Sequence, residues 1–365
     1  MIMFASVIAC LILHIADAPP SNYIQPEVTG NSFLSFHSSR WNGEKGERTF
    51  KSNFRFRRIQ FAHLSVALGL ADQVGGDLQF RVFRTQSKMK AQWDFLLLLV
   101  LYRLATPSVY RSCVDLFGRS NTALSSFFRE AIDYLYTRFA AKGVDPFIWT
   151  DCFMRFIELF SAWDVPVRNV IGVIDGNFIQ ICRPGGLGNV HARYPQEHYY
   201  SGKEKKHGIK FLAMALANGM LGVSGAYRGS MHDSKMMEKA GWENKLRDVQ
   251  ISTGVQMVMF GDAGFATSPH LITMYRGFIP LPGLTFNAFM SRVRILVENQ
   301  FASLKQTFRT LGDVQHMKLG NGHIDREYIV AVFLFNCFSI FNGNQVTKAL
   351  KVHSNNLEGY IARCK

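Results

Sequence analysis

Three acidic residues occupy positions where a metal-dependent reaction could use them. Asp175 and Asp262 each follow a short apolar run, at 170–174 and 255–260, and each has glycine within two residues after it. Glu298 lies 36 positions beyond Asp262 in a stretch predicted to be helical. Phosphodiester cleavage needs an activated water and neutralised charge, and two divalent ions held by carboxylates supply both. We therefore predict that these acids converge around metal.

Asp175 has a simpler explanation when it is considered alone. The apolar, β-branched residues 170–174 favour a strand buried on both faces, although periodicity does not separate it from a buried helix. An Asp-Gly turn after a core strand would explain Asp175 without metal. A buried carboxylate is costly unless a cation compensates it, however, and the pattern recurs at Asp262. The recurrence makes a bound cation the better explanation.

A fourth acid, Asp233, follows His232 where a helix is predicted to open at Lys235. Helix capping alone would account for it, because Asp is a preferred N-cap residue. We predict instead that Asp233 is a metal ligand, and this choice depends on the family resemblance given below.

Composition limits the classes of protein and of partner. The chain has 365 residues, of which 48% are hydrophobic and 19% charged, so it can bury a large core and is not a disordered chain. Its formal net charge is +14. Such an excess favours polyanionic partners, nucleic acid before anionic membrane, although a generic basic soluble protein would share it.

Cysteine usage and the N-terminus point to different compartments. The six cysteines have neither a C-x-x-C pair nor zinc-ligand spacing, which favours reduced thiols inside a cell. Met1–Ala18 instead resembles a signal peptide, although it lacks Lys and Arg and is too short to span a bilayer comfortably. Either the chain is secreted, or this segment is not part of the working protein. The remaining observations favour the second explanation.

Four regions are expected along the chain. They are a signal-like or poorly ordered segment at 1–51, a helical region at 52–150, an α/β region at 165–345 and a C-terminal tail at 346–365. The α/β region is predicted to contain strands and a long helix that carries Glu298. The strands are expected at 207–216, 220–227, 255–260 and 278–282, and the helix at 287–308.

The helical region contains two segments that could contact nucleic acid. The stretches 107–117 and 120–139, joined through Gly118, have the outline of a helix-turn-helix, and simple helical packing explains them equally well. Phe54–Arg58 interleaves aromatic rings with positive charge and could stack on bases. A structured start to a helix ending near Leu70 is the favoured explanation for it.

Four sequence blocks together carry a family resemblance. The blocks are Ile174–Gly176, Ser230–Ser234, Gly261–Phe265 and Arg294–Lys305. In this order they resemble the signature blocks of the PIF/Harbinger transposase superfamily, whose domain is called the DDE transposase type 4 domain. The resemblance extends over about residues 52–345. Any one block is a weak signal, and the four in register are a strong one.

The resemblance implies an α/β, RNase H-like mixed sheet flanked by helices, with an N-terminal helix-turn-helix-like subdomain. It implies Asp175, Asp262 and Glu298 as the catalytic triad and Asp233 as an additional metal ligand. The metal would be divalent, Mg²⁺ first, with Mn²⁺ as a substitute. The reaction would be cleavage of DNA at transposon terminal inverted repeats and joining of the freed end to target DNA.

Partners follow from the same resemblance and from charge. We expect DNA, a separate Myb-like DNA-binding protein, a second copy of the chain and a nuclear location, with no membrane partner. Five basic side chains are predicted to contact DNA. Arg294 and Lys305 lie in the fourth block, and Lys205, Lys206 and Lys210 lie around the start of the strand expected at 207–216.

Two residues depart from the family pattern, and neither of them touches an acid. Two other functions compete with the transposase interpretation. Asn177 stands where relatives often have Thr, and Ala302 where they often have Gly. A domesticated DNA-binding or interaction protein without cleavage activity is the main alternative. A secreted protein of unrelated function is supported only by the first eighteen residues.

Overall fold

The computed structural model places one mixed sheet at the centre of the α/β region. The structure describes residues 35–74, 77–163, 165–185, 194–277, 279–320, 323–352 and 355–365. The sheet has six strands in the order β10-β9-β5-β7-β6, with β8 paired to β7. The strands are β5 (Val170–Gln180), β6 (Tyr200–Ser201), β7 (Lys206–Leu216), β8 (Leu221–Arg228), β9 (Val258–Gly261) and β10 (Leu271–Thr273).

The apolar run before Asp175 is the central strand. β5 pairs antiparallel with β7 and parallel with β9, so it has a neighbour on both edges. Val170, Ile171, Val173 and Ile174 are all buried. A strand covered on both faces needs apolar residues at consecutive positions, because neither face meets water. The strand prediction is therefore confirmed, and the helical alternative is wrong.

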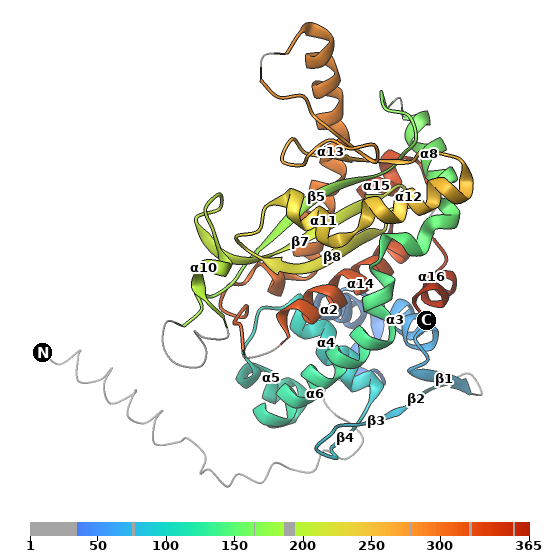
Figure 1. The fold of residues 1–365 in the computed structure, drawn as a ribbon. Coiled ribbons are helices and arrows are strands. Elements are labelled where there is room, and N and C mark those ends of the chain that lie inside the picture. The colour runs from blue at the N-terminus through green and yellow to red at the C-terminus, as the bar shows by residue number, and fades with distance from the viewer. Residues whose placement is uncertain are drawn as a thin grey trace, which may run out of the picture.

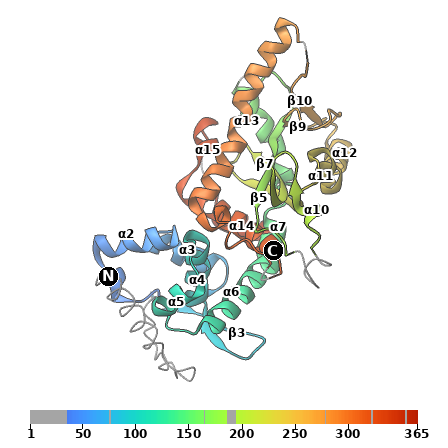
Figure 2. The same ribbon diagram turned by 90° about the vertical axis from the view of Figure 1, so that its left-hand side faces the viewer.

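Helices cover both faces of this sheet (Figure 2). On one side lie α13 (Leu281–Thr307), α14 (Ile324–Asn342) and α15 (Gln345–Ala349). On the other lie α11 (Asp233–Ala240) and α12 (Trp242–Thr253). α8 (Phe153–Ala162) also packs on β5. This arrangement confirms the predicted α/β class, a mixed sheet flanked by helices as in RNase H-like nucleases.

The N-terminal region is mainly helical, as expected, and adds two small hairpins. Its helices are α2 (Gly43–Phe54), α3 (Arg58–Ala67), α4 (Trp93–Ala105), α5 (Tyr110–Phe117) and α6 (Asn121–Leu135). Short turns of helix are η1 (Ser39–Trp41), η2 (Tyr136–Ala140), α7 (Ala141–Gly143) and η3 (Pro146–Cys152). The hairpins, which the sequence analysis did not predict, pair β1 (Ala71–Val74) with β2 (Asp77–Phe80) and β3 (Val82–Arg84) with β4 (Lys90–Gln92).

The two helices with a helix-turn-helix outline are α5 and α6. Gly118 ends α5 in the left-handed conformation, and the Ser120 hydroxyl accepts a hydrogen bond from the Ala123 N–H at the start of α6. One face of α6 is buried, and the helix contacts α4, α5 and α14. These contacts give α6 a packing role, and its role in reading DNA stays a prediction.

Two predicted boundaries differ from the structure. The strand expected at 278–282 is wrong, because α13 begins at Leu281 and the additional strand is β10. Helical structure begins before residue 52, since α2 starts at Gly43 and buries Phe50. The signal-like segment at 1–18 lies outside the described residues. A helix needs only local hydrogen bonds, so it extends wherever its apolar face finds a neighbour.

The C-terminal segment is part of the core, not a tail. Its helix α16 (Leu357–Cys364) buries Leu357, Tyr360 and Ile361 and contacts α3 and α7. The Tyr360 hydroxyl donates a hydrogen bond to the Gly143 carbonyl at 3.0 Å. The expectation of a tail at 346–365 is therefore corrected, because these apolar side chains find partners that are distant in the sequence.

Helix α14 joins the sheet to the N-terminal helices (Figure 1). Its Tyr328 ring stacks on Phe211 of β7 with ring centroids 3.8 Å apart. Within the described residues, Ile324–Ala349 is the one helical stretch long and apolar enough to cross a membrane, and 67% of its most apolar window is buried in the protein. Its hydropathy is accounted for by this central position, since both sides of α14 contact protein.

Arg55 connects three helix ends. Its Nε donates to the Thr307 carbonyl of α13 at 2.7 Å and its Nη2 to the Ala105 carbonyl of α4 at 2.8 Å, while Nη1 donates to the Ser52 carbonyl of α2. The last carbonyls of a helix have no partner within the helix and carry its negative end. Burial, with the nearby Arg309, lowers the pKa of Arg55. The guanidinium thus joins the N-terminal helices to the α/β region.

We expect Arg55→Met to lower the free energy of unfolding by about 2–4 kcal/mol, because three helix-end carbonyls lose a charged donor. Lys51→Met, on an exposed lysine one turn earlier in α2, should change it by about 0.5 kcal/mol or less. Chemical denaturation followed by circular dichroism measures both. Equal effects of the two substitutions would show that Arg55 does not hold these helix ends.

Candidate active site

Strand pairing brings Asp175 and Asp262 together. β5 and β9 are parallel neighbours, and Ile174 lies opposite Gly261 in their register. The next residue on each strand is the acid, so both carboxylates leave the sheet at the same level. β9 ends there while β5 continues along β7, where Asp175 lies opposite Ala213. The predicted convergence of these two acids is therefore present in the backbone.

Asp233 lies beside this pair, at the first residue of α11. The N-cap position is His232, so the capping explanation for Asp233 is wrong. A Cβ atom added at Gly264 would lie 3.3 Å from Asp233 Oδ2 and 3.9 Å from Asp262 Oδ2. A Cβ atom at Gly176 would lie 3.2 Å from Asp233 Oδ1. Both glycines therefore leave room for carboxylates, which explains why they follow the acids.

Glu298 joins the group through an arginine. Arg294 and Glu298 are one turn apart on α13, and Arg294 Nη2 lies 2.8 Å from Glu298 Oε1. The same guanidinium reaches Asp175, with Nη1 3.8 Å from Oδ2. α13 packs along β5, which holds both residues near the strand. The helix therefore places Glu298 on the side of β5 that carries Asp175.

Burial and, to a smaller extent, the neighbouring acids raise the pKa of Asp175. Burial raises the pKa of this carboxyl to about 6, and the negative charges of Asp262 and Asp233 add to the rise. A hydrogen bond from the Gly176 N–H and the charge of Arg294 oppose it. A carboxylate held in this way is stabilised by any cation that comes close.

The predicted DNA contacts divide into two groups. Lys210 Nζ lies 3.4 Å from Asp233 Oδ1 and donates to the Met231 carbonyl at 2.8 Å, so Lys210 and Arg294 both face the acids. Lys205 and Lys206 are exposed at the turn between β6 and β7. Lys305 is partly buried on α13, and burial lowers its pKa. In this structure Lys210 and Arg294 compensate carboxylates, and their contact with DNA stays a prediction.

The four acids fit a magnesium site in their chemistry. All four offer hard oxygen ligands, which Mg²⁺ prefers. In the described part of the chain, no group of three or more His, Cys, Asp or Glu side chains is close enough to hold a metal ion as the side chains stand. Arg294 accounts for part of this separation, because its guanidinium lies between Asp175 and Glu298.

The sequence predicted Lys210 and Arg294 as DNA contacts, and their pairing with the acids was missed. The four-residue spacing of Arg294 and Glu298 was a readable signal, because such residues are neighbours on a helix surface. No local signal marks Lys210, whose partner Asp233 is brought to it by the fold. The departure at Asn177 is structural, since its buried side chain donates to the Tyr328 hydroxyl at 2.7 Å.

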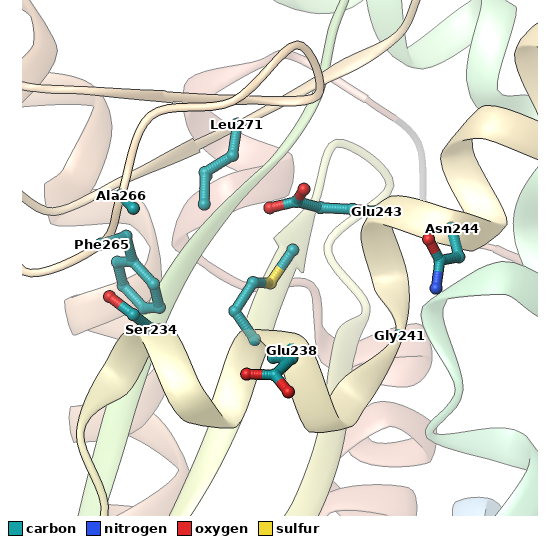
Figure 3. Close-up of a pocket in the computed structure, with 9 residues that line it drawn as sticks. Ser234, Glu238, Gly241, Glu243, Asn244, Phe265, Ala266 and Leu271 are labelled. Carbon is teal, nitrogen blue, oxygen red and sulfur yellow. The ribbon is translucent and has the colours of Figure 1, made fainter.

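A cavity of about 210 Å³ lies next to the segments that carry Asp233 and Asp262, and neither of these acids lines it (Figure 3). Ser234 and Phe265, which end the second and third sequence blocks, line it together with Glu238 and Glu243. Phe265 is buried, and Lys235 neutralises Glu238. The cavity is therefore separate from the cluster of Asp175, Asp233, Asp262 and Glu298.

Comparison with known families agrees with this geometry. Residues 174–336 match the family described as DDE superfamily endonuclease. This stretch is similar to the DDE superfamily endonucleases and is called the DDE domain. The DDE domain contains all four acids, and the match is consistent with the resemblance to PIF/Harbinger transposases. Neither a curated protein nor a solved structure matches the chain.

The raised pKa of Asp175 in the DDE domain predicts an unusual pH dependence. Its folded pKa of about 6 exceeds the ordinary 3.8, so its stabilising contribution is present below pH 4 and lost as pH rises through 6. We expect Asp175→Asn to stabilise the metal-free protein by about 2 kcal/mol at pH 7.5, or about 3 °C in Tm. The gain should vanish near pH 4, as thermal unfolding in EDTA would measure.

Asp151→Asn is a control whose effect on Tm at pH 7.5 should have the opposite sign. Its hydrogen bond from Arg363 lowers the pKa of Asp151, so its stabilising contribution is present at neutral pH and lost on acidification. The substitution should therefore lower Tm at pH 7.5. A stabilisation by Asp175→Asn that did not change with pH would contradict the burial and repulsion inferred for this carboxyl.

Proposed function

We propose that this protein is a metal-dependent transposase or transposase-derived nuclease. It would cleave DNA at transposon terminal inverted repeats and transfer the freed strand to target DNA. The observation that carries the proposal is the position of Asp175 and Asp262 at one level of two adjacent parallel strands. Asp233 and Glu298 approach the same point from α11 and α13 within a DDE endonuclease domain.

Each of the four acids would have a distinct role in the reaction. Asp175, Asp262 and Glu298 form the catalytic triad, and Asp233 supplies a further carboxylate to the metal. Bound Mg²⁺, or Mn²⁺ in its place, would lower the pKa of a water and neutralise charge on the reacting phosphate. Asp175 and Asp262 are held by the sheet, so the spacing of their backbones is rigid. Rigid support of this kind is needed to hold ligands in a productive geometry.

Charge supports DNA as the substrate. The chain carries 41 Lys and Arg against 27 Asp and Glu, and the exposed Lys205 and Lys206 lie on the strand pair that leads to Lys210 beside Asp233. We propose that this turn contacts the phosphate backbone. A nuclear location, a Myb-like partner protein and assembly with a second copy belong to the same proposal.

A domesticated DNA-binding protein without cleavage activity is the second candidate. One observation favours it, namely that the acids of the described residues do not close into a metal-binding group as they stand. Such a protein would bind DNA in EDTA and would not nick it with any divalent metal. The retention of all four acids argues for the nuclease instead.

The nuclease proposal predicts a specific loss of activity. Purified protein with Mg²⁺ or Mn²⁺ should nick DNA that carries the element's own terminal repeats. Asp262→Asn should lower the nicking rate by about 100-fold or more, because a ligand at the site of charge development is lost. Asp248→Asn, on an exposed acid of α12, should leave the rate unchanged. Cleavage by Asp262→Asn at the wild-type rate would refute the assigned roles.

The β6–β7 turn predicts a measurable electrostatic contribution to DNA binding. Lys205→Gln with Lys206→Gln should weaken binding and reduce the slope of log K against log salt concentration by about 2, one unit for each lost phosphate contact. Lys348→Gln with Lys351→Gln is the matched control. Each pair is exposed and includes one lysine of positive φ, Lys205 or Lys351, both at 52°. Equal slopes for the two double variants, measured by fluorescence anisotropy in EDTA, would exclude the turn as a contact.

A further inference from the structure

Arg294 occupies the space between two of the four acids. Its guanidinium lies 2.8 Å from Glu298 and 3.8 Å from Asp175. The Arg294 side chain is 30% exposed, against 18% for Asp175 and 43% for Glu298. The guanidinium therefore holds together, in the absence of metal, two carboxylates that would otherwise repel each other.

The contacts of Arg294 differ from those of the other internal cations. The Arg55 guanidinium donates to three backbone carbonyls, and Lys210 donates to the Met231 carbonyl as well as facing Asp233. Among the described residues, the only partners of Arg294 are the two carboxylates. No backbone acceptor holds it in place, so another cation that binds the same oxygens can replace it.

We propose that Arg294 is an exchangeable counter-ion, which positions Asp175 and Glu298 in the metal-free protein and leaves them when a divalent cation binds. The inference rests on the proposed function, since it takes these acids as metal ligands. Because the arginine and the cation compete for the same oxygens, the arginine weakens metal binding and keeps the empty site folded. Arg294 is a positioning residue in this account, not a contact for the phosphate backbone.

Competition gives Arg294→Gln two opposite effects. The metal-free Tm should fall by about 1–2 °C, because the carboxylates lose their compensating charge. The dissociation constant for Mn²⁺ should fall about five- to tenfold, because no ion pair has to break. Calorimetric titration with Mn²⁺ at constant ionic strength measures the second effect without DNA and without cleavage. Arg294→Lys keeps the charge and should bind Mn²⁺ within about twofold of wild type.

Arg292→Gln is the matched control. It removes the same charge from the same helix, and Arg292 is exposed with its guanidinium over the Phe289 ring. Loss of long-range charge alone would tighten Mn²⁺ binding equally in both glutamine variants, and that result would overturn the proposal. Unchanged Mn²⁺ affinity in Arg294→Gln, together with weaker DNA binding in EDTA, would also overturn it and make Arg294 a DNA contact.

The titration also separates this inference from the proposed function. Wild-type protein that binds Mn²⁺ while Arg294→Gln binds it no more tightly would contradict the counter-ion role alone. Wild-type protein that binds no Mn²⁺ at millimolar concentration would overturn both, because the four acids would then not form a metal site.

Discussion

The parallel pairing of β5 with β9 is the constraint on which the site depends. It places Ile174 opposite Gly261 and therefore brings two carboxylates to one level of the sheet. A shift of the register by one residue would turn Asp175 and its neighbours to the opposite face. The apolar residues before both acids fill the core, so burial of the strand and position of the acid are set by the same contacts. Fold stability and site geometry are thus coupled at this strand pair.

Carboxylates that lie close together repel one another, and cations of the same chain compensate this repulsion. Asp175 has a raised pKa because it is buried and because Asp262 and Asp233 are near. Arg294 and Lys210 supply the nearest positive charges, each in an ion pair with the acids. A site that binds divalent metal must leave its ligands without permanent partners. In the proposed counter-ion role, Arg294 compensates the carboxylates while the site is empty and has no backbone anchor that would keep it there when metal binds.

The chain forms one continuous core, although its sequence suggests separate regions. α14 contacts both the sheet and α6, and α16 returns to pack on α3 and α7. Arg55 of the N-terminal region binds the last carbonyl of α13, the helix that carries Glu298. The N-terminal helices therefore support the C-terminal end of α13 mechanically.

Sequence alone indicated the strand before Asp175, the helix of Glu298 and the mixed α/β class, because run length, β-branched content and apolar pattern are local signals. It selected the four acids through the motif blocks, and their roles stay a prediction. It misplaced the strand at 278–282 and treated 346–365 as a tail, because the burial of α16 depends on helices that are distant in sequence. The tertiary structure decided that Lys210 and Arg294 face carboxylates, since the partner of a side chain across a sheet is fixed by packing. The tertiary structure also decided that Asp233 is not a helix cap. The exact start of α11 depends on the preceding turn, which places Asp233 beside Gly176 and Gly264.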